Sequence, residues 1–98
     1  MTFTGEKMKQ IWKYDIEMED VCELKLPVGS KVLCAQEQHG GPKLWALVDP
    51  NEKKMETRKF RHSGTGQDIP EENLEYIDTY QLINGSLIFH LFEIKEGK

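Results

Sequence analysis

The dipeptide Asn84-Gly85 is the feature that most constrains the fold of this chain. Both residues tolerate the positive φ angles of a type I′ turn, so this pair between two apolar runs predicts a tight β-hairpin. The flanking strands are expected over residues 75–83 and 86–95. A two-residue loop also fixes the strand register, and it places Thr79 opposite His90.

The predicted hairpin is apolar on both faces. Alternation puts one set of large side chains on one face: Tyr76, Tyr80, Leu82, Leu87, Phe89 and Leu91. The other face carries a second set: Ile77, Ile83, Ile88, Phe92 and Ile94. Such strands must be covered on both faces, whereas a chain of 98 residues forms one small core. We therefore expect one face in the core and the other against a second subunit. The alternative is a sandwich or barrel that wraps the whole hairpin.

Shorter alternating or apolar runs predict further strands upstream of the hairpin. They cover residues 12–18, 22–26, 31–38, 43–48 and 56–62, with Pro-, Gly- and Asn-rich turns between them. We thus predict a mainly β fold, an antiparallel sheet or small barrel or sandwich of about six to seven strands. Residues 1–9 are expected to be a flexible tail, and residues 10–98 a single β domain.

The segment before the last hairpin is expected to be less regular. Residues 63–68 contain Gly64 and Gly66, which argues against regular structure there. Pro70 followed by two acids is favourable at the start of a helix, so residues 69–73 could hold the one short helical turn of the chain.

Composition excludes several classes of function. The formal net charge of −4 disfavours general DNA binding, which depends on neutralising phosphates. No apolar run approaches the roughly 20 residues of a membrane helix, and the first ten residues contain no apolar leader core, so a cytoplasmic protein is expected. Cys22 and Cys34 are expected to be free thiols, and the three histidines are too scattered to predict a metal site.

The sequence gives little indication of catalysis. Ser63 lies beside His62, but neighbouring side chains of a strand point to opposite faces. His90 lies among apolar neighbours and is interpreted as a core residue. No phosphate loop of the Walker type is present. We therefore predict a binding protein that is not an enzyme and has no cofactor.

The segment from Arg58 to Gly66 is the best candidate for a binding site. It concentrates cations in an acidic chain and runs into a glycine-flanked bend. Arginine binds phosphate bidentately, and glycines let backbone N–H groups face an anion. The candidate ligand-binding residues are Arg58, Arg61, His62, Gly64, Thr65 and Gly66, with Trp12, Tyr14 and Trp45 as rings that could stack on a base. The alternatives are a basic edge strand and rings that belong to the core.

Four stretches of the chain resemble, in the same order, a family of small proteins encoded by tailed bacteriophages and prophages. They are Ile11-Trp12-Lys13-Tyr14, Leu44-Trp45-Ala46-Leu47-Val48-Asp49-Pro50, Arg61-His62-Ser63-Gly64-Thr65-Gly66-Gln67-Asp68-Ile69-Pro70 and Phe89-His90-Leu91-Phe92-Glu93. The resemblance extends over residues 10–94. The family often has an aromatic residue at the position of Ser63, so no stacking role is expected there.

The family looks like the phage sponge proteins, which sequester the cyclic nucleotide signals of antiphage systems such as CBASS without cleaving them. The resemblance implies an anti-defence protein in the cytoplasm of the infected host. It also implies a homo-oligomer, a dimer or tetramer, that binds a cyclic di- or oligonucleotide. The alternatives are a protein-binding inhibitor of a host enzyme and a minor structural phage protein.

Overall fold

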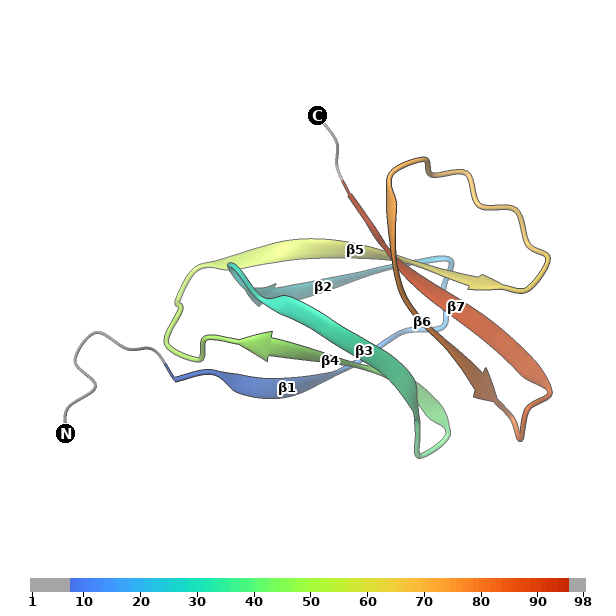
Figure 1. Cartoon of the computed structure of the whole chain (residues 1–98), viewed down its shortest axis with the longest axis horizontal. Coiled ribbons are helices and arrows are strands. Elements are labelled where there is room, and N and C mark those ends of the chain that lie inside the picture. Colours follow the sequence, from blue (N-terminus) through green and yellow to red (C-terminus); the bar gives the residue numbers. More distant parts are fainter. Residues whose placement is uncertain (1–7, 96–98) are drawn as a thin grey trace.

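The computed structural model describes residues 8–95, which form seven β-strands in two antiparallel sheets and no helix (Figure 1). The strands are β1 (Gln10–Asp15), β2 (Val21–Pro27), β3 (Lys31–Gln38), β4 (Gly41–Val48), β5 (Met55–Gly64), β6 (Leu74–Leu82) and β7 (Leu87–Ile94). The mainly β antiparallel fold predicted from the sequence is confirmed. Most of the expected N-terminal tail, residues 1–7, lies outside the described residues.

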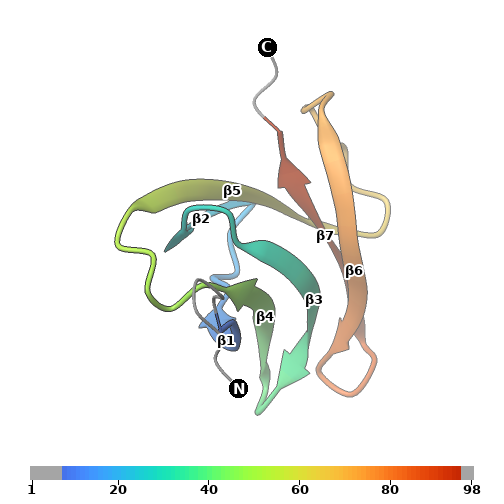
Figure 2. The same cartoon turned by 60° about the vertical axis from the view of Figure 1, so that its left-hand side comes forward.

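The two sheets curve around a shared interior (Figure 2). The three-stranded sheet has the order β1-β4-β3, and the four-stranded sheet has the order β2-β5-β7-β6. The edge strands β3 and β6 lie side by side, and the backbone N–H of Ala35 donates a hydrogen bond to the Asp78 carboxylate at 3.1 Å. At the other end, β1 and β2 form no ladder within residues 8–95. The barrel is therefore joined along one seam and open along the other.

One apolar layer fills the space between the inner faces of the sheets. Leu44 and Val48 enter it from β4, and Leu26, Phe60 and Leu91 enter it from the four-stranded sheet, all almost fully buried. Burial of a Leu or Phe side chain contributes about 1.5–3 kcal/mol. This layer holds the sheets together, and the other face of each sheet is turned away from it.

Two tight turns set the register of the hairpins. His39 and Gly40 join β3 to β4 with φ angles of 56° and 86°, as a type I′ turn requires. Asn84 and Gly85 join β6 to β7 with φ angles of 52° and 87°. Thr79 pairs with His90, which confirms the register predicted from Asn84-Gly85.

A β-bulge in β6 changes which side chains share a face. The register shifts between Tyr76 and Asp78, and the extra residue of a bulge reverses the alternation beyond it. Ile77 packs against the core, whereas Tyr76 lies on the outer face opposite Phe92. The predicted faces of Tyr76 and Ile77 were therefore wrong. Beyond the bulge, Tyr80 is buried with Leu91 as predicted.

The ends of β1 and β5 also differ from the sequence prediction. β1 ends at Asp15 and not at Met18. The N–H of Ile16 still donates to the Pro42 carbonyl at 3.1 Å, but Pro42 has no N–H to donate in return, so the ladder stops at the pair of Asp15 with Lys43. Gly64 continues β5 instead of starting an irregular segment, because β7 is long enough to pair with it through Phe89.

Residues 69–73 form no helical turn. Glu71 is bound to Arg61, and the carbonyl of Asn73 accepts a hydrogen bond from the N–H of Lys95 at 2.8 Å. These contacts hold the segment against the four-stranded sheet. One isolated helical turn has no neighbouring turns to offset the entropy of nucleation.

The hydrogen bond between β3 and β6 gives a test of how the two sheets are joined. Asp78→Ala leaves the Ala35 N–H without its charged acceptor, and such bonds contribute about 1.5–3 kcal/mol. We expect urea denaturation to show a loss of that size in the free energy of unfolding. Asp68→Ala, at an exposed position, serves as the charge-matched control. Equal stability of the two variants would contradict the role of this contact.

Candidate functional site

The two predicted phosphate-binding arginines point to opposite faces of the four-stranded sheet. Arg58 bonds Glu93, whose partner in the ladder is the buried Phe60, so Arg58 lies on the inner side. Arg61 pairs with Phe92 and therefore lies on the outer side. Three residues separate the arginines, and strand side chains alternate between faces. The single pocket expected from the sequence is therefore not formed.

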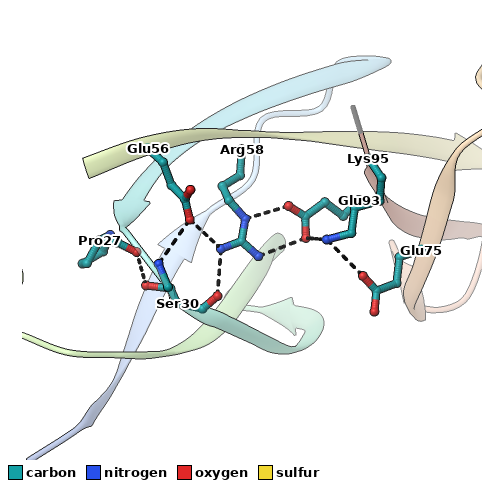
Figure 3. Close-up of polar contacts among 8 residues, drawn as sticks. Pro27, Ser30, Glu56, Arg58, Glu75, Glu93 and Lys95 are labelled. Atoms are coloured by element: carbon teal, nitrogen blue, oxygen red, sulfur yellow. Dashed lines mark hydrogen bonds and ion pairs between the residues drawn. The ribbon is translucent and has the colours of Figure 1, made fainter. Parts of the chain in front are cut away.

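Arg58 is held in a network of carboxylates at one end of the barrel (Figure 3). Its Nε and Nη2 donate to the two oxygens of Glu93 at 2.6 and 3.1 Å, and its Nη1 donates to the Ser30 carbonyl at 2.8 Å and to Glu56 at 3.3 Å. Lys95 bridges Glu93 and Glu75 at 3.6 and 3.2 Å. A cleft of about 410 Å³ adjoins the network, but the guanidinium that faces it is already neutralised and makes four hydrogen bonds.

The three candidate rings lie on the three-stranded sheet and not beside the bend. Trp12 and Tyr14 pack against the core, and burial raises the pKa of the Tyr14 hydroxyl. Trp45 is half-buried on the outer face of that sheet, because its neighbours Leu44 and Ala46 point inward. The expected combination of these rings with the basic strand is therefore wrong within one chain.

His62 is a core residue. It is only 4% exposed and stacks between Tyr80 and Phe89, with ring centroids 5.6 and 4.5 Å away. Its Nε2 has no hydrogen-bond partner. Burial lowers the pKa of the imidazole, since the charged form would lose its hydration. His62 supports the fold, and its ring is shielded from solvent.

Arg61 makes a two-point ion pair with the loop that crosses the outer face. Its Nε donates to Glu71 Oε1 at 2.8 Å, and its Nη2 donates to Glu71 Oε2. This bonding lowers the pKa of the Glu71 carboxyl and raises that of Arg61. A carboxylate held in this fork occupies the position that two phosphate oxygens would take.

The Gly64–Gln67 bend is ordered and lies beside a cavity. Gly64 N–H donates to the Gln67 side chain at 2.6 Å, and Gln67 N–H donates to the Gly64 carbonyl at 3.1 Å. Gly66 has a φ angle of 92°, which a side chain would strain. The cavity of about 440 Å³ is lined by the bend and by residues 86–89, and its volume falls within the roughly 300–1,000 Å³ of small-molecule sites.

A chain of hydrogen bonds runs from the bend across the outer face. Thr65 Oγ1 bonds His90 Nε2 at 2.8 Å, His90 Nδ1 bonds Thr79 Oγ1 at 2.9 Å, and Thr79 Oγ1 bonds Tyr76 Oη at 2.7 Å. The Tyr76 ring meets Phe92 edge to face, with centroids 5.7 Å apart. We call Arg61, Thr65, Tyr76, Thr79, His90 and Phe92 the outer-face site.

Sequence reasoning identified only Arg61 and Thr65 of the outer-face site. His90 was interpreted as a core residue because its neighbours in the sequence are apolar. The hairpin register already placed Thr79 across from His90, and two polar residues paired on an outer face are a signal of function. Tyr76 could not be found in this way, because the bulge moves it to that face.

The outer-face site places a hydroxyl next to an imidazole. Thr65 and His90 are close enough for a hydroxyl nucleophile and its base, but both hydrogen-bond partners of His90 are hydroxyls. The pair lacks the carboxylate that stabilises an imidazolium in a Ser-His-Asp triad. Among residues 8–95, no group of three or more His, Cys, Asp or Glu side chains is placed to hold a metal ion.

Comparison with known proteins gives one match. A family model described as a domain of unknown function, DUF7352, matches residues 8–98. No curated protein and no solved structure matches the chain. The described residues contain no helix long and apolar enough to cross a membrane.

Burial of His62 predicts a pH dependence of stability. Its folded-state pKa lies below the unfolded value, so the unfolded chain binds more protons and stability falls as pH decreases through about 6.5. We expect a decline of at most about 1.4 kcal/mol per pH unit between about pH 7.5 and 5. Denaturation of His62→Phe should lack this component, because Phe cannot be protonated.

The other histidines, His39 and His90, remain in His62→Phe and provide the internal control. The ring of Phe also fits the stack between Tyr80 and Phe89 without an unpaired nitrogen. An unchanged slope in the variant would show that His62 is not the group that titrates.

Proposed function

The chain belongs to the DUF7352 family, and we propose that it is a non-catalytic sponge that captures a cyclic di- or oligonucleotide signal of host antiphage defence. The observation that supports this proposal is the hydrogen-bonded chain from Thr65 to Tyr76. It connects a bend beside a cavity with a pair of aromatic rings on the outer face.

Each part of a nucleotide has a matching group in the outer-face site. The hydroxyl of Thr65, whose oxygen is held by His90 Nε2, offers a hydrogen bond to a phosphate oxygen, and the ring of Tyr76, 57% exposed, offers a surface for a base. Base stacking on an aromatic ring contributes about 1–3 kcal/mol. Arg61 provides the cation once the ligand phosphate displaces Glu71, since both anions fit the guanidinium fork.

The proposed sponge is a homo-oligomer whose second copy covers the outer face. Nanomolar capture requires about −12 kcal/mol, and association costs about 4–15 kcal/mol. One ring pair and a few hydrogen bonds on an open face supply too little. Tyr76 and Ile88, at 57% and 42% exposure, leave an apolar surface for a second copy, which would enclose the ligand and contribute its own contacts.

Thermal shift and calorimetry with a panel of cyclic mono-, di- and trinucleotides test the proposal. A ligand at about 100-fold its Kd stabilises the folded protein by about 2.7 kcal/mol, or about 10–20 °C in a domain of this size. Mass spectrometry of the heat-released ligand should recover it intact. No stabilisation by any panel member at saturation would contradict the proposal, and a cleaved product would indicate an enzyme.

Two substitutions test where the ligand binds. Thr65→Val removes one hydrogen bond, so we expect affinity to fall about 3–10-fold, whereas Thr57→Val, beside the Arg58 cleft, should have no effect. Glu71→Gln should strengthen binding of the same nucleotide, because the phosphate no longer competes with a carboxylate for Arg61. Weaker binding by Glu71→Gln would show that this ion pair supports the site and is not displaced.

The tip of the last hairpin favours a second candidate function. Ile83 is 68% exposed and has a φ angle of 52°, a conformation that a β-branched residue rarely adopts. An apolar side chain held out in this way suits contact with another protein, as in an inhibitor of a host enzyme. Pull-down from host lysate with the wild type and Ile83→Asn separates this candidate from the sponge, which needs no protein partner.

A further inference from the structure

Within residues 8–95, the outer edge of β2 is a row of backbone hydrogen-bonding groups that pairs with no other strand. The carbonyl of Asp20 accepts from the N–H of His62, and the N–H of Val28 donates to the carbonyl of Lys54, both at 2.9 Å. Hydrogen-bonded pairs alternate along an antiparallel ladder, so the even-numbered residues of β2 bond to β5. The N–H and C=O groups of Val21, Glu23 and Lys25 therefore point away from the sheet.

This edge is accessible to another strand. Val21, Glu23 and Lys25 are all exposed, and a groove of about 420 Å³ adjoins the strand. The groove is lined by residues 21–24 together with Asp15, Glu17 and Glu19. Charges on an edge strand commonly prevent pairing, but here opposite charges alternate, and that pattern is complementary to itself.

We propose that β2 pairs antiparallel with β2 of a second copy across a two-fold axis at Leu24. In this register Glu23 lies opposite Lys25 of the second copy, and Lys25 lies opposite its Glu23. The outward N–H and C=O groups of these residues exchange hydrogen bonds between the copies. Leu24 meets Leu24 on the inner side, where it already packs against the core.

The charges of Glu23 and Lys25 favour this strand register over the register shifted by one residue. A shift by one residue in the axis would place Glu23 opposite Glu23 of the second copy, and like charges directly opposite each other destabilise a strand pair. Pro27 ends the strand and lacks an N–H, so it limits the pairing to a short segment. The pair of chains would share one continuous sheet through their β2 strands.

The β2 contact goes beyond the proposed function, because it uses a different surface from the outer-face site. It needs no ligand and lies at the open seam of the barrel, away from β6 (Figure 2). Two different two-fold interfaces in one chain give a closed tetramer when their axes intersect at right angles. The outer-face contact alone gives a dimer.

Charge reversal with light scattering and sedimentation tests the β2 contact. Glu23→Lys and Lys25→Glu each place like charges together in both halves of the interface, so we expect the dissociation constant to rise about tenfold or more. The double variant E23K/K25E restores opposite charges and should recover the wild-type mass. Glu72→Lys, at an exposed position outside β2, is the control for net charge.

Hydrogen exchange gives an independent readout. Amides of Val21, Glu23 and Lys25 should become protected as protein concentration rises, and they should stay unprotected in Glu23→Lys. In a Tyr76→Ala background, which removes the proposed outer-face contact, the wild-type β2 edge should still give a dimer.

Three results would overturn the β2 proposal. They are a monomer in the Tyr76→Ala background at high concentration, a double variant as dissociated as the single ones, and fast exchange of the edge amides at every concentration. None of them bears on nucleotide binding, which is measured separately on the outer face.

Discussion

The structure depends on a single apolar layer between two sheets. Leu44 and Val48 on one side meet Leu26, Phe60 and Leu91 on the other, and the chain is too short to build a second layer of this kind. Each sheet therefore has one face in the core, and the loop bound to Arg61 through Glu71 covers part of the other face of the four-stranded sheet. On the outer face of the last hairpin Tyr76 and Ile88 stay exposed, and polar and aromatic side chains gather there.

The bulge in β6 connects the fold to the proposed site. By reversing the alternation it turns Asp78 toward β3, where its carboxylate accepts the N–H of Ala35, and turns Tyr76 outward to Phe92. One irregularity thus closes the seam between the sheets and supplies the exposed ring of the outer-face site. A strand without the bulge would do neither.

The sequence predicted the parts of the fold that local geometry decides. Asn84-Gly85 set the hairpin register, and alternation located every strand to within a few residues. The bulge was not predictable, because no residue type marks it. The ion pairs of Arg58 and Arg61 were not predicted for a related reason, since Glu93 lies 35 residues from Arg58 and Glu71 lies in the loop after β5.

The directions of the Trp12 and Trp45 side chains could not be predicted from the sequence either. The alternating pattern around Trp12 is the same whether the Trp12 side chain points into the core or out to solvent. The pairing of β1 with β4 decides that Trp12 packs on the core. Trp45 lies in a nearly continuous apolar run, which suggests burial on both faces, yet β4 has a covering layer on one side alone. Side-chain direction in this protein follows from tertiary pairing.

We propose that a cyclic nucleotide binds at the outer face and not at the arginine network at the end of the barrel. NMR mapping of backbone amides, during titration with the most stabilising nucleotide of the panel, distinguishes the two places. We expect chemical-shift changes to cluster at Thr65, Gln67, Tyr76 and His90. Shifts confined to Gly29–Lys31 and Lys95, which line the Arg58 clefts, or no localised shifts at all, would contradict it.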